Sequence, residues 1–157
     1  MADIISDGLT RVTWVASISN PSAPTTTELN GGVALESFVT ADGWDASTTT
    51  DSVDNSSLDS TQNTELPGRR SDSLILTFKQ QGKANAPWTT FSGNPAGYLV
   101  RRSGIAKGTA WTAAQKVTVY PVSAGFRDEK APAKNELEKF AVPFMITGAV
   151  LDNATVA

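Results

Sequence analysis

The sequence contains no histidine and no cysteine. Histidine is the commonest general base, the commonest ligand of transition metals and the usual charge switch near neutral pH. Without cysteine, the chain can form neither disulfides nor thiolate metal sites. These absences predict a protein that is not an enzyme and that carries no cofactor and no metal ion.

Motifs for nucleotide and acyl-transfer chemistry are missing as well. Residues 104–109 contain the residue types of a phosphate-binding loop in the wrong order, and no strand–loop–helix pattern surrounds them. The acids at 42–45 and 51–59 miss the spacing of an EF-hand calcium loop, so exposed loop acids are the simpler interpretation. A glycosidase-type pair of carboxylates stays open, because the separation of such a pair depends on the fold.

Long apolar runs are also lacking. No stretch approaches the roughly 20 apolar residues that a membrane-spanning helix needs. The first residues, Met-Ala-Asp-Ile-Ile, have neither the basic nor the apolar region of a signal peptide. We therefore expect no membrane association, and a length of 157 residues predicts one domain over residues 1–157. Residues 1–10 are expected to form an N-terminal arm.

Positive charge is scarce in the first part of the chain. Residues 1–68 hold ten acids and a single base, Arg11, for a net charge of −9, whereas residues 69–157 hold twelve bases and six acids, for +6. If the two parts segregate in space, copies of the chain can stack head to tail. If the fold interleaves them, the asymmetry averages out, and the sequence leaves both possibilities open.

Several short stretches alternate between apolar and polar residues, as half-buried strands do. The strongest alternation lies in Glu138–Leu151, where every even position from Phe140 to Ile146 is large and apolar. The other predicted strands are Thr10–Ile18, Glu36–Thr40 with a turn after it at Asp42-Gly43, Asp72–Gln80, Gly97–Arg102 and Lys116–Val122.

Helical signals are weak. Asn85 can cap a short helix over Ala86–Phe91, while Thr25 and Glu28 have the spacing of a capping box ahead of one helical turn at most. The whole pattern predicts a mainly β fold: a β-sandwich or small barrel with one short flanking α-helix and a long polar loop.

The polar loop is the stretch Ala46–Pro67, which consists mostly of Ser, Thr, Asp and Asn. Its larger aliphatic residues are Val53, Leu58 and Leu66. A polar stretch of this length is usually functional or disordered. Its Thr and Val content would let it pair as a hairpin if another surface ordered it.

Trp44, Trp88 and Trp111 all stand near predicted turns. They could form a stacking platform for sugars, or they could pack the corners of a small β-domain. We favour corner packing, because large aromatic side chains are mostly buried.

The order and spacing of short motifs along almost the whole chain carry a family resemblance. The motifs are Glu28–Gly32, Asp42-Gly43, a polar stretch ending in Leu66–Arg69, Ser73–Phe78, a short helix, Gly97–Arg102, Val117–Val122, and a last strand with Lys139-Phe140 and Ile146–Gly148. In this order the chain resembles the major tail tube protein of long, non-contractile-tailed bacteriophages.

The resemblance implies a structural virion protein that self-assembles into stacked hexameric rings. These rings would form the tail tube through which DNA passes without being read. The implied partners are further copies of the chain and the tape-measure, tail terminator and distal tail proteins. The implied location is the virion tail, after assembly in the host cytoplasm. An excess of acid suits a lumen that must not hold DNA, since Lys and Arg are what bind phosphates.

In such families a long loop reaches the neighbouring ring or subunit. By this resemblance we expect Ala46–Pro67 to contact the next ring, Gly125–Lys134 to contact a neighbour, and the N-terminal arm to do either. The expected contact residues are Asp51, Asp54, Asp59, Arg69, Arg70, Arg127 and Asp128. The alternatives are another virion β-domain, such as a head decoration or tail completion protein, and a carbohydrate-binding module that uses the tryptophans.

Overall fold

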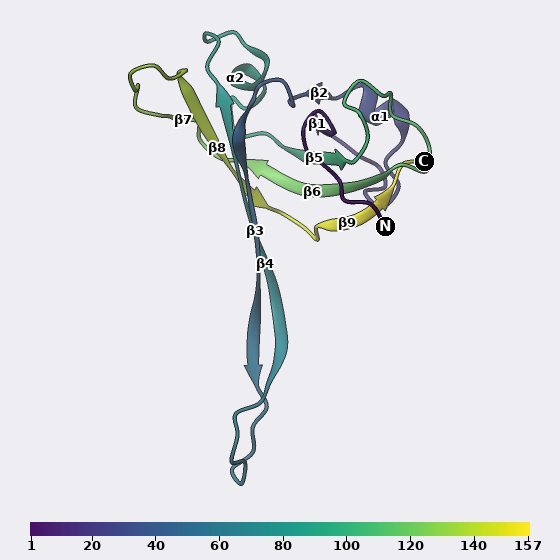
Figure 1. Cartoon of the computed structure of the whole chain (residues 1–157), viewed down its shortest axis with the longest axis vertical. Coiled ribbons are helices and arrows are strands. Elements are labelled where there is room, and N and C mark those ends of the chain that lie inside the picture. Colours follow the sequence, from purple (N-terminus) through teal and green to yellow (C-terminus); the bar gives the residue numbers. More distant parts are fainter.

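The computed structural model describes residues 1–157 (Figure 1). The elements in chain order are β1 (Thr10–Val15), α1 (Thr26–Asn30), β2 (Val33–Ala34), β3 (Val39–Asp54), β4 (Glu65–Lys79), α2 (Ala86–Thr90), β5 (Ala96–Ser103), β6 (Lys116–Ala124), β7 (Asp128–Glu129), β8 (Lys139–Ile146) and β9 (Leu151–Thr155). The strands form one antiparallel sheet in the order β2-β1-β5-β6-β8-β4-β3, with β7 beside β8 and β9 beside β6. The predicted mainly β, sandwich-like fold is confirmed, with two short helices instead of one.

The sheet curls around a first apolar core that lies under α2. Phe78 of β4 and Phe140 of β8 stack with their ring centroids 5.4 Å apart. Phe91, at the end of α2, packs edge-on against Trp14 of β1 at 5.1 Å. All four side chains are buried. These contacts join the first strand to the strands of the second half of the chain.

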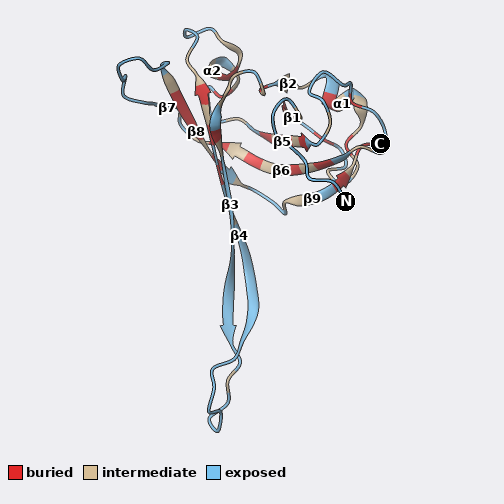
Figure 2. Cartoon of the chain, in the orientation of Figure 1, coloured by how far each residue is buried: buried red, intermediate tan, exposed pale blue.

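A second core lies at the other end of the sheet, under α1. Leu29 of α1 packs there with Trp111 and with residues of β6 and β9. β6 serves both cores: Val117 and Val119 face the second one, whereas the strand's last residues face the first. Figure 2 shows that the buried residues are confined to this curled body.

The predicted C-terminal strand is shorter than expected. Phe140, Val142 and Phe144 point into the core as the alternation predicts. The strand ends at Ile146. Thr147 still donates its N–H to the carbonyl of Pro121 on β6, but Pro121 has no N–H to donate in return, so the β6–β8 ladder stops there. Pairing along β6 then passes from β8 to β9, so the expected strand over 138–151 was wrong in its extent.

Two local predictions differ from the structure near the start of β3. The expected strand over Glu36–Thr40 begins only at Val39, because the N–H of Val39 bonds back to the carbonyl of the buried Leu35. The expected turn at Asp42-Gly43 is a bulge in β3. A Cβ at Gly43 would lie 2.5 Å from the carbonyl oxygen of Thr77, so this close approach needs glycine.

The capping box is present and the helix after it is short. The N–H of Glu28 donates to the Thr25 hydroxyl, and the Glu28 carboxylate accepts from the N–H of Thr25. The same carboxylate also accepts from the N–H and the hydroxyl of Ser19. These bonds hold the pKa of Glu28 down, at about 2.

The stretch expected as a long polar loop is a β-hairpin. β3 and β4 pair from Ala46 opposite Leu74 to Asp54 opposite Glu65, with a register shift between Thr50 and Ser52. The hairpin projects from the body as an arm (Figure 1). The hairpin that the Thr and Val content allowed is formed by β3 and β4 of one chain. The name "arm" is used below for residues 46–73.

Candidate assembly surfaces

The arm exposes nearly every residue that it contains. Residues 46–71 are all exposed except Ser56, which is half-buried, and Figure 2 shows the arm almost entirely pale blue. The tip is held only by short-range bonds, such as the N–H of Ser56 to the Asp54 carboxylate at 2.8 Å. An isolated two-stranded ribbon is marginally stable in water. Because its residues are exposed, the arm contributes little to its own subunit's core.

The three acids expected as contact residues, Asp51, Asp54 and Asp59, lie along the far part of the arm. None of them forms an ion pair within the chain. Hydrogen bonds from Ser56 lower the pKa of Asp54, and a bond from the hydroxyl of Ser57 lowers the pKa of Asp59. Both groups therefore stay charged well below neutral pH.

Arg69 and Arg70 lie on β4 but differ in their contacts. Arg69 is exposed and forms no ion pair, whereas Arg70 joins the base of the arm to β9. The Arg70 guanidinium donates to Asp72 at 2.9 Å and to Asp152 at 2.8 Å. These bonds raise the pKa of Arg70 and lower that of Asp152. Arg70 thus binds within its own subunit and clamps the arm to the body.

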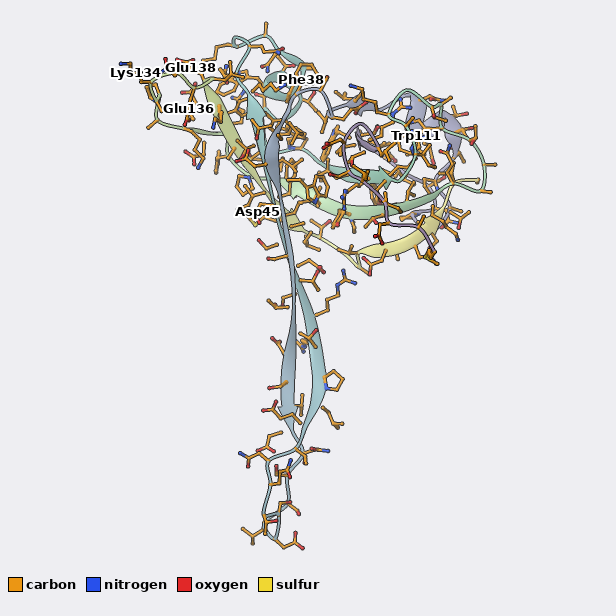
Figure 3. All side chains as sticks on the ribbon, viewed as in Figure 1. Phe38, Asp45, Trp111, Lys134, Glu136 and Glu138 are labelled. Carbon is orange, nitrogen blue, oxygen red and sulfur yellow. The ribbon has the colours of Figure 1, made fainter.

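Arg127 and Asp128 lie at the other end of the molecule from the arm's tip. Arg127 is half-buried: its guanidinium stacks on Trp88 at 4.0 Å and donates to the Trp88 carbonyl at 2.7 Å. Asp128 is exposed on β7 and pairs with Lys130. Figure 3 shows the following loop, with Lys134 and Glu136, reaching away from the body at this end.

The sheet presents an outer face on the side of β3, β4 and β8 that lies away from the cores. Side chains alternate along strands, and Ile75 points outward between the buried Leu74 and Leu76. Asp45 and Pro143 are the strand partners of Ile75, and Figure 3 marks Asp45 on this side. The outer face comprises Asp45, Ser47, Thr49, Ser71, Ser73, Ile75, Thr77, Pro143 and Met145.

Asp45 is the one charged residue among those nine. Arg69 lies beyond this set toward the tip, and Lys79 and Lys139 lie beyond it at the opposite end. The sequence missed this surface, since it appears only when β3, β4 and β8 are placed side by side. The period-two spacing of Ser71, Ser73 and Ile75 was the signal that could have indicated it.

A groove borders the base of the arm, where β4 and β8 separate. Its volume is about 730 Å³, and it is lined by β4 over 70–75, by the end of β8 over 143–146 and by the link over 148–150. Ile75 and Met145 expose 37% and 58% of their surface there. The β4–β8 pairing ends at Leu74 opposite Phe144. The β4 edge beyond that pair therefore has no partner strand in the chain.

The three tryptophans lie apart and each packs against a basic side chain. Trp111 is buried between Arg11 and Arg102, at 4.9 and 4.7 Å from its ring, while Trp44 and Trp88 lie at two other places. This is the corner packing that we favoured, and no shared stacking platform results. The structure also brings together no group of three acids that could hold a metal ion.

Arg102 organises the loop after β5. Its side chain is fully buried, and it donates to the carbonyls of Ala106, Thr109 and Ala110 at 2.9–3.3 Å. No carboxylate pairs with it, so burial lowers its pKa. Arg101 and Arg102 are adjacent in the sequence, but alternation along β5 sends their side chains to opposite faces of the sheet.

No helix of the structure combines the length and apolar character needed to cross a membrane. Residues 1–9 form neither helix nor strand and are largely exposed. One contact that places them is a hydrogen bond from the N–H of Lys107 to the carbonyl of Gly8.

Comparisons with known proteins support the family resemblance of the sequence. A family model described as "Phage tail tube protein" matches residues 1–157. No curated protein matches the sequence significantly. Among solved structures, the chain is similar to a chain in the cryo-EM structure of the anti-feeding prophage (AFP) baseplate, 6-fold symmetrised. The TM-score is 0.62 at 10% identity, over 96% of this chain and 97% of that one, which shows a shared fold. This chain belongs to the phage tail tube protein family and is a structural component of the virion tail.

Proposed function

We propose that the chain self-assembles into stacked hexameric rings, and that these rings form the tail tube through which DNA passes. The observation that carries this proposal is the arm: an ordered hairpin with almost no contact to its own body, in a chain whose full length matches the tail tube family. A marginal ribbon of this kind gains stability when copies of the chain cover it. The solved relative was six-fold symmetrised, which agrees with six subunits in a ring.

The free edge of β3 supports lateral assembly. β3 ends the sheet, so its outer N–H and C=O groups have no partner strand. It spans Val39–Asp54 and contains no proline and no lysine, which are the residues that commonly protect an edge. Its acids and its bulge at Gly43 are the protections that it does carry, and an open edge of this length can pair with another chain. In a ring it becomes a joint between neighbours.

The outer face suits the lining of the DNA channel. Binding of DNA without sequence preference depends on Lys and Arg that neutralise phosphates. The nine residues of the outer face include neither, and Asp45 adds repulsion. A channel lined by this face lets DNA slide, because the wall offers hydroxyl groups and no fixed cation. We therefore assign the outer face to the lumen.

The remaining surfaces take the other contacts. In this proposal the far part of the arm, with Asp51, Asp54, Asp59 and Arg69, contacts the adjacent ring, and Asp128 with the loop that follows contacts a neighbour. Arg70 and Arg127 act indirectly, since each is engaged within its own subunit. The N-terminal segment, residues 1–10, adds to either contact. The tape-measure, tail terminator and distal tail proteins complete the tail as partners.

Electron microscopy of the purified protein over a range of concentrations tests this function. Hollow tubes or rings of uniform diameter are expected at high concentration. A protein that stays monomeric at every concentration and binds glycans would instead favour the carbohydrate-binding alternative.

A lumen variant tests the channel lining. Ser47→Lys and Ser73→Lys, introduced together, place two cations per subunit on the outer face and should make assembled tubes retain DNA. The matched pair Ser47→Asn and Ser73→Asn should not. Equal DNA retention by both pairs would show that the outer face lies elsewhere in the assembly.

A further inference from the structure

We propose that the face of β1 and β5 under Trp111 binds a small monovalent anion, of which chloride is the representative. The side chains that would hold it are those of Arg11, Thr13, Arg102 and Trp111. The site belongs to the single subunit, so it does not depend on the proposed assembly into rings.

Two guanidinium groups lie close together at this place. Arg11 of β1 and Arg102 of β5 are strand partners. Both donate to one acceptor, the carbonyl oxygen of Thr109, at 3.0 and 2.9 Å. Both also lie against the ring of Trp111, which Figure 3 labels, at 4.9 and 4.7 Å from its centroid. Two positive charges are thus held side by side within the body.

The two charges are not balanced by acids. The one carboxylate that pairs with either of them is Glu36, and its Oε1 lies 3.9 Å from Nε of Arg11, too far for a hydrogen bond. Arg102 is fully buried and forms no ion pair. Two guanidinium groups and one carboxylate leave a net charge of about +1 on the cluster. A buried charge without a partner is costly, and a bound anion would offset that cost.

Several buried donors of the same cluster have no acceptor. They are Nε of Arg11, Nε of Arg102, the indole N–H of Trp111 and the hydroxyl of Thr13. Thr13 is two residues from Arg11 along β1, so its side chain points to the same face. The unpartnered acceptor in the cluster is Oε2 of Glu36. Buried polar groups are normally hydrogen-bonded, and donors in such excess favour an anion as the ligand.

Burial limits the size of the ligand. Arg102, Thr13 and Trp111 expose 0%, 1% and 3% of their surface, so no side chain or phosphate group of another molecule reaches them. The side chains of Arg11 and Glu36 are each 20% exposed and mark the side from which an ion would enter. A bound anion would stabilise the loop after β5, because carbonyl groups of that loop accept from both arginines.

Thermal unfolding of the dilute, unassembled subunit tests the site. Chloride is exchanged for methanesulfonate at constant ionic strength, since methanesulfonate is too large for a buried site. When chloride is at about 100 times its dissociation constant, the melting temperature should be roughly 5–10 °C above the value without chloride. Equal melting temperatures in all mixtures of the two salts would overturn the proposal.

Two matched variants separate a site from a general salt effect. Thr13→Val removes one of the unpartnered donors and keeps the size of the side chain, so the affinity for chloride should fall at least about tenfold. Thr10→Val makes the same change on the other face of β1 and should keep the chloride dependence of the wild type. The same chloride dependence in both variants would overturn the proposal.

Diffraction from crystals grown in bromide locates the ion directly. Bromide scatters anomalously, and its peak should lie in hydrogen-bonding contact with Nε of Arg102 and the hydroxyl of Thr13. A water molecule at that place, without an anomalous peak, would show that solvent satisfies the donors and would overturn the proposal. None of these results bears on whether the protein forms tubes, so the proposed function is tested separately.

Discussion

Replacing the outer part of the arm by a tight turn should separate assembly from folding. Thr49 and Ser71 are strand partners, so Asn-Gly in place of residues 50–70 closes a two-residue hairpin between them. The removed residues are exposed apart from the half-buried Ser56, so no core side chain is lost. The variant should be a folded monomer that forms no tubes.

The expected change in stability is small. The replacement removes the Arg70–Asp152 ion pair, and ion pairs between exposed side chains contribute little to stability. The melting temperature should therefore stay close to that of the wild type. Leu99→Ala is the contrasting control, because Leu99 is fully buried and its truncation costs about 2–5 kcal/mol.

Calorimetry measures the melting temperature of each variant, and electron microscopy of the same samples shows whether tubes form. A cooperative transition within a few degrees of wild type, without tubes, is expected of the arm replacement. A fall in melting temperature as large as that of Leu99→Ala, or loss of a cooperative transition, would show that the arm belongs to the folding core. Tubes of normal appearance would show that it has no part in assembly.

Three further predictions concern charge. Arg70→Gln or Asp152→Asn breaks the ion pair between Arg70 and Asp152 at the base of the arm. Spin labels at the tip and on the body should then give a broader distance distribution than in wild type. An unchanged distribution would mean that strand pairing alone sets the arm's direction. Raising the salt concentration should weaken polymerisation, because ions screen exposed charges over about 8–10 Å, and assembly that is indifferent to salt would point to apolar or main-chain joints. The pKa of Glu28 is lowered from 4.5 to about 2, so its contribution to stability is complete above pH 4.5 and is lost as the pH falls toward 2. Glu28→Gln should remove that part of the pH dependence, as urea melts between pH 2 and 6 can measure. If the stabilities of wild type and Glu28→Gln change with pH in parallel, the hydrogen bonds of Glu28 do not stabilise the fold.

Local patterns predicted much of the body correctly. The alternation in Phe140–Phe144 identified the core face of β8, and the spacing of Thr25 and Glu28 identified the helix start. Such signals work because a side chain's direction depends on its own strand or turn. The bulge at Gly43 escaped this reasoning, since its cause is the Thr77 carbonyl, which lies on another strand.

The arm shows where local reasoning stops. The stretch from Ala46 to Pro67 has few apolar residues, and that scarcity suggested an irregular loop. β4 is anchored to the core through Leu74 and Leu76, so the register set in the body continues outward and pairs the polar residues in turn. A polar sequence can follow a strand that is already in place, although it cannot start one.

The amino-acid sequence alone determined that this protein is a mainly β chain without histidine or cysteine, and that most of its acids lie in the first part of the chain and most of its bases in the second. These properties follow from residue types and their near neighbours. The tertiary structure decided which edges stay unpaired, which residues form the outer face and which arginine clamps the arm. Those features depend on distant strands lying side by side, and no local pattern specifies that pairing.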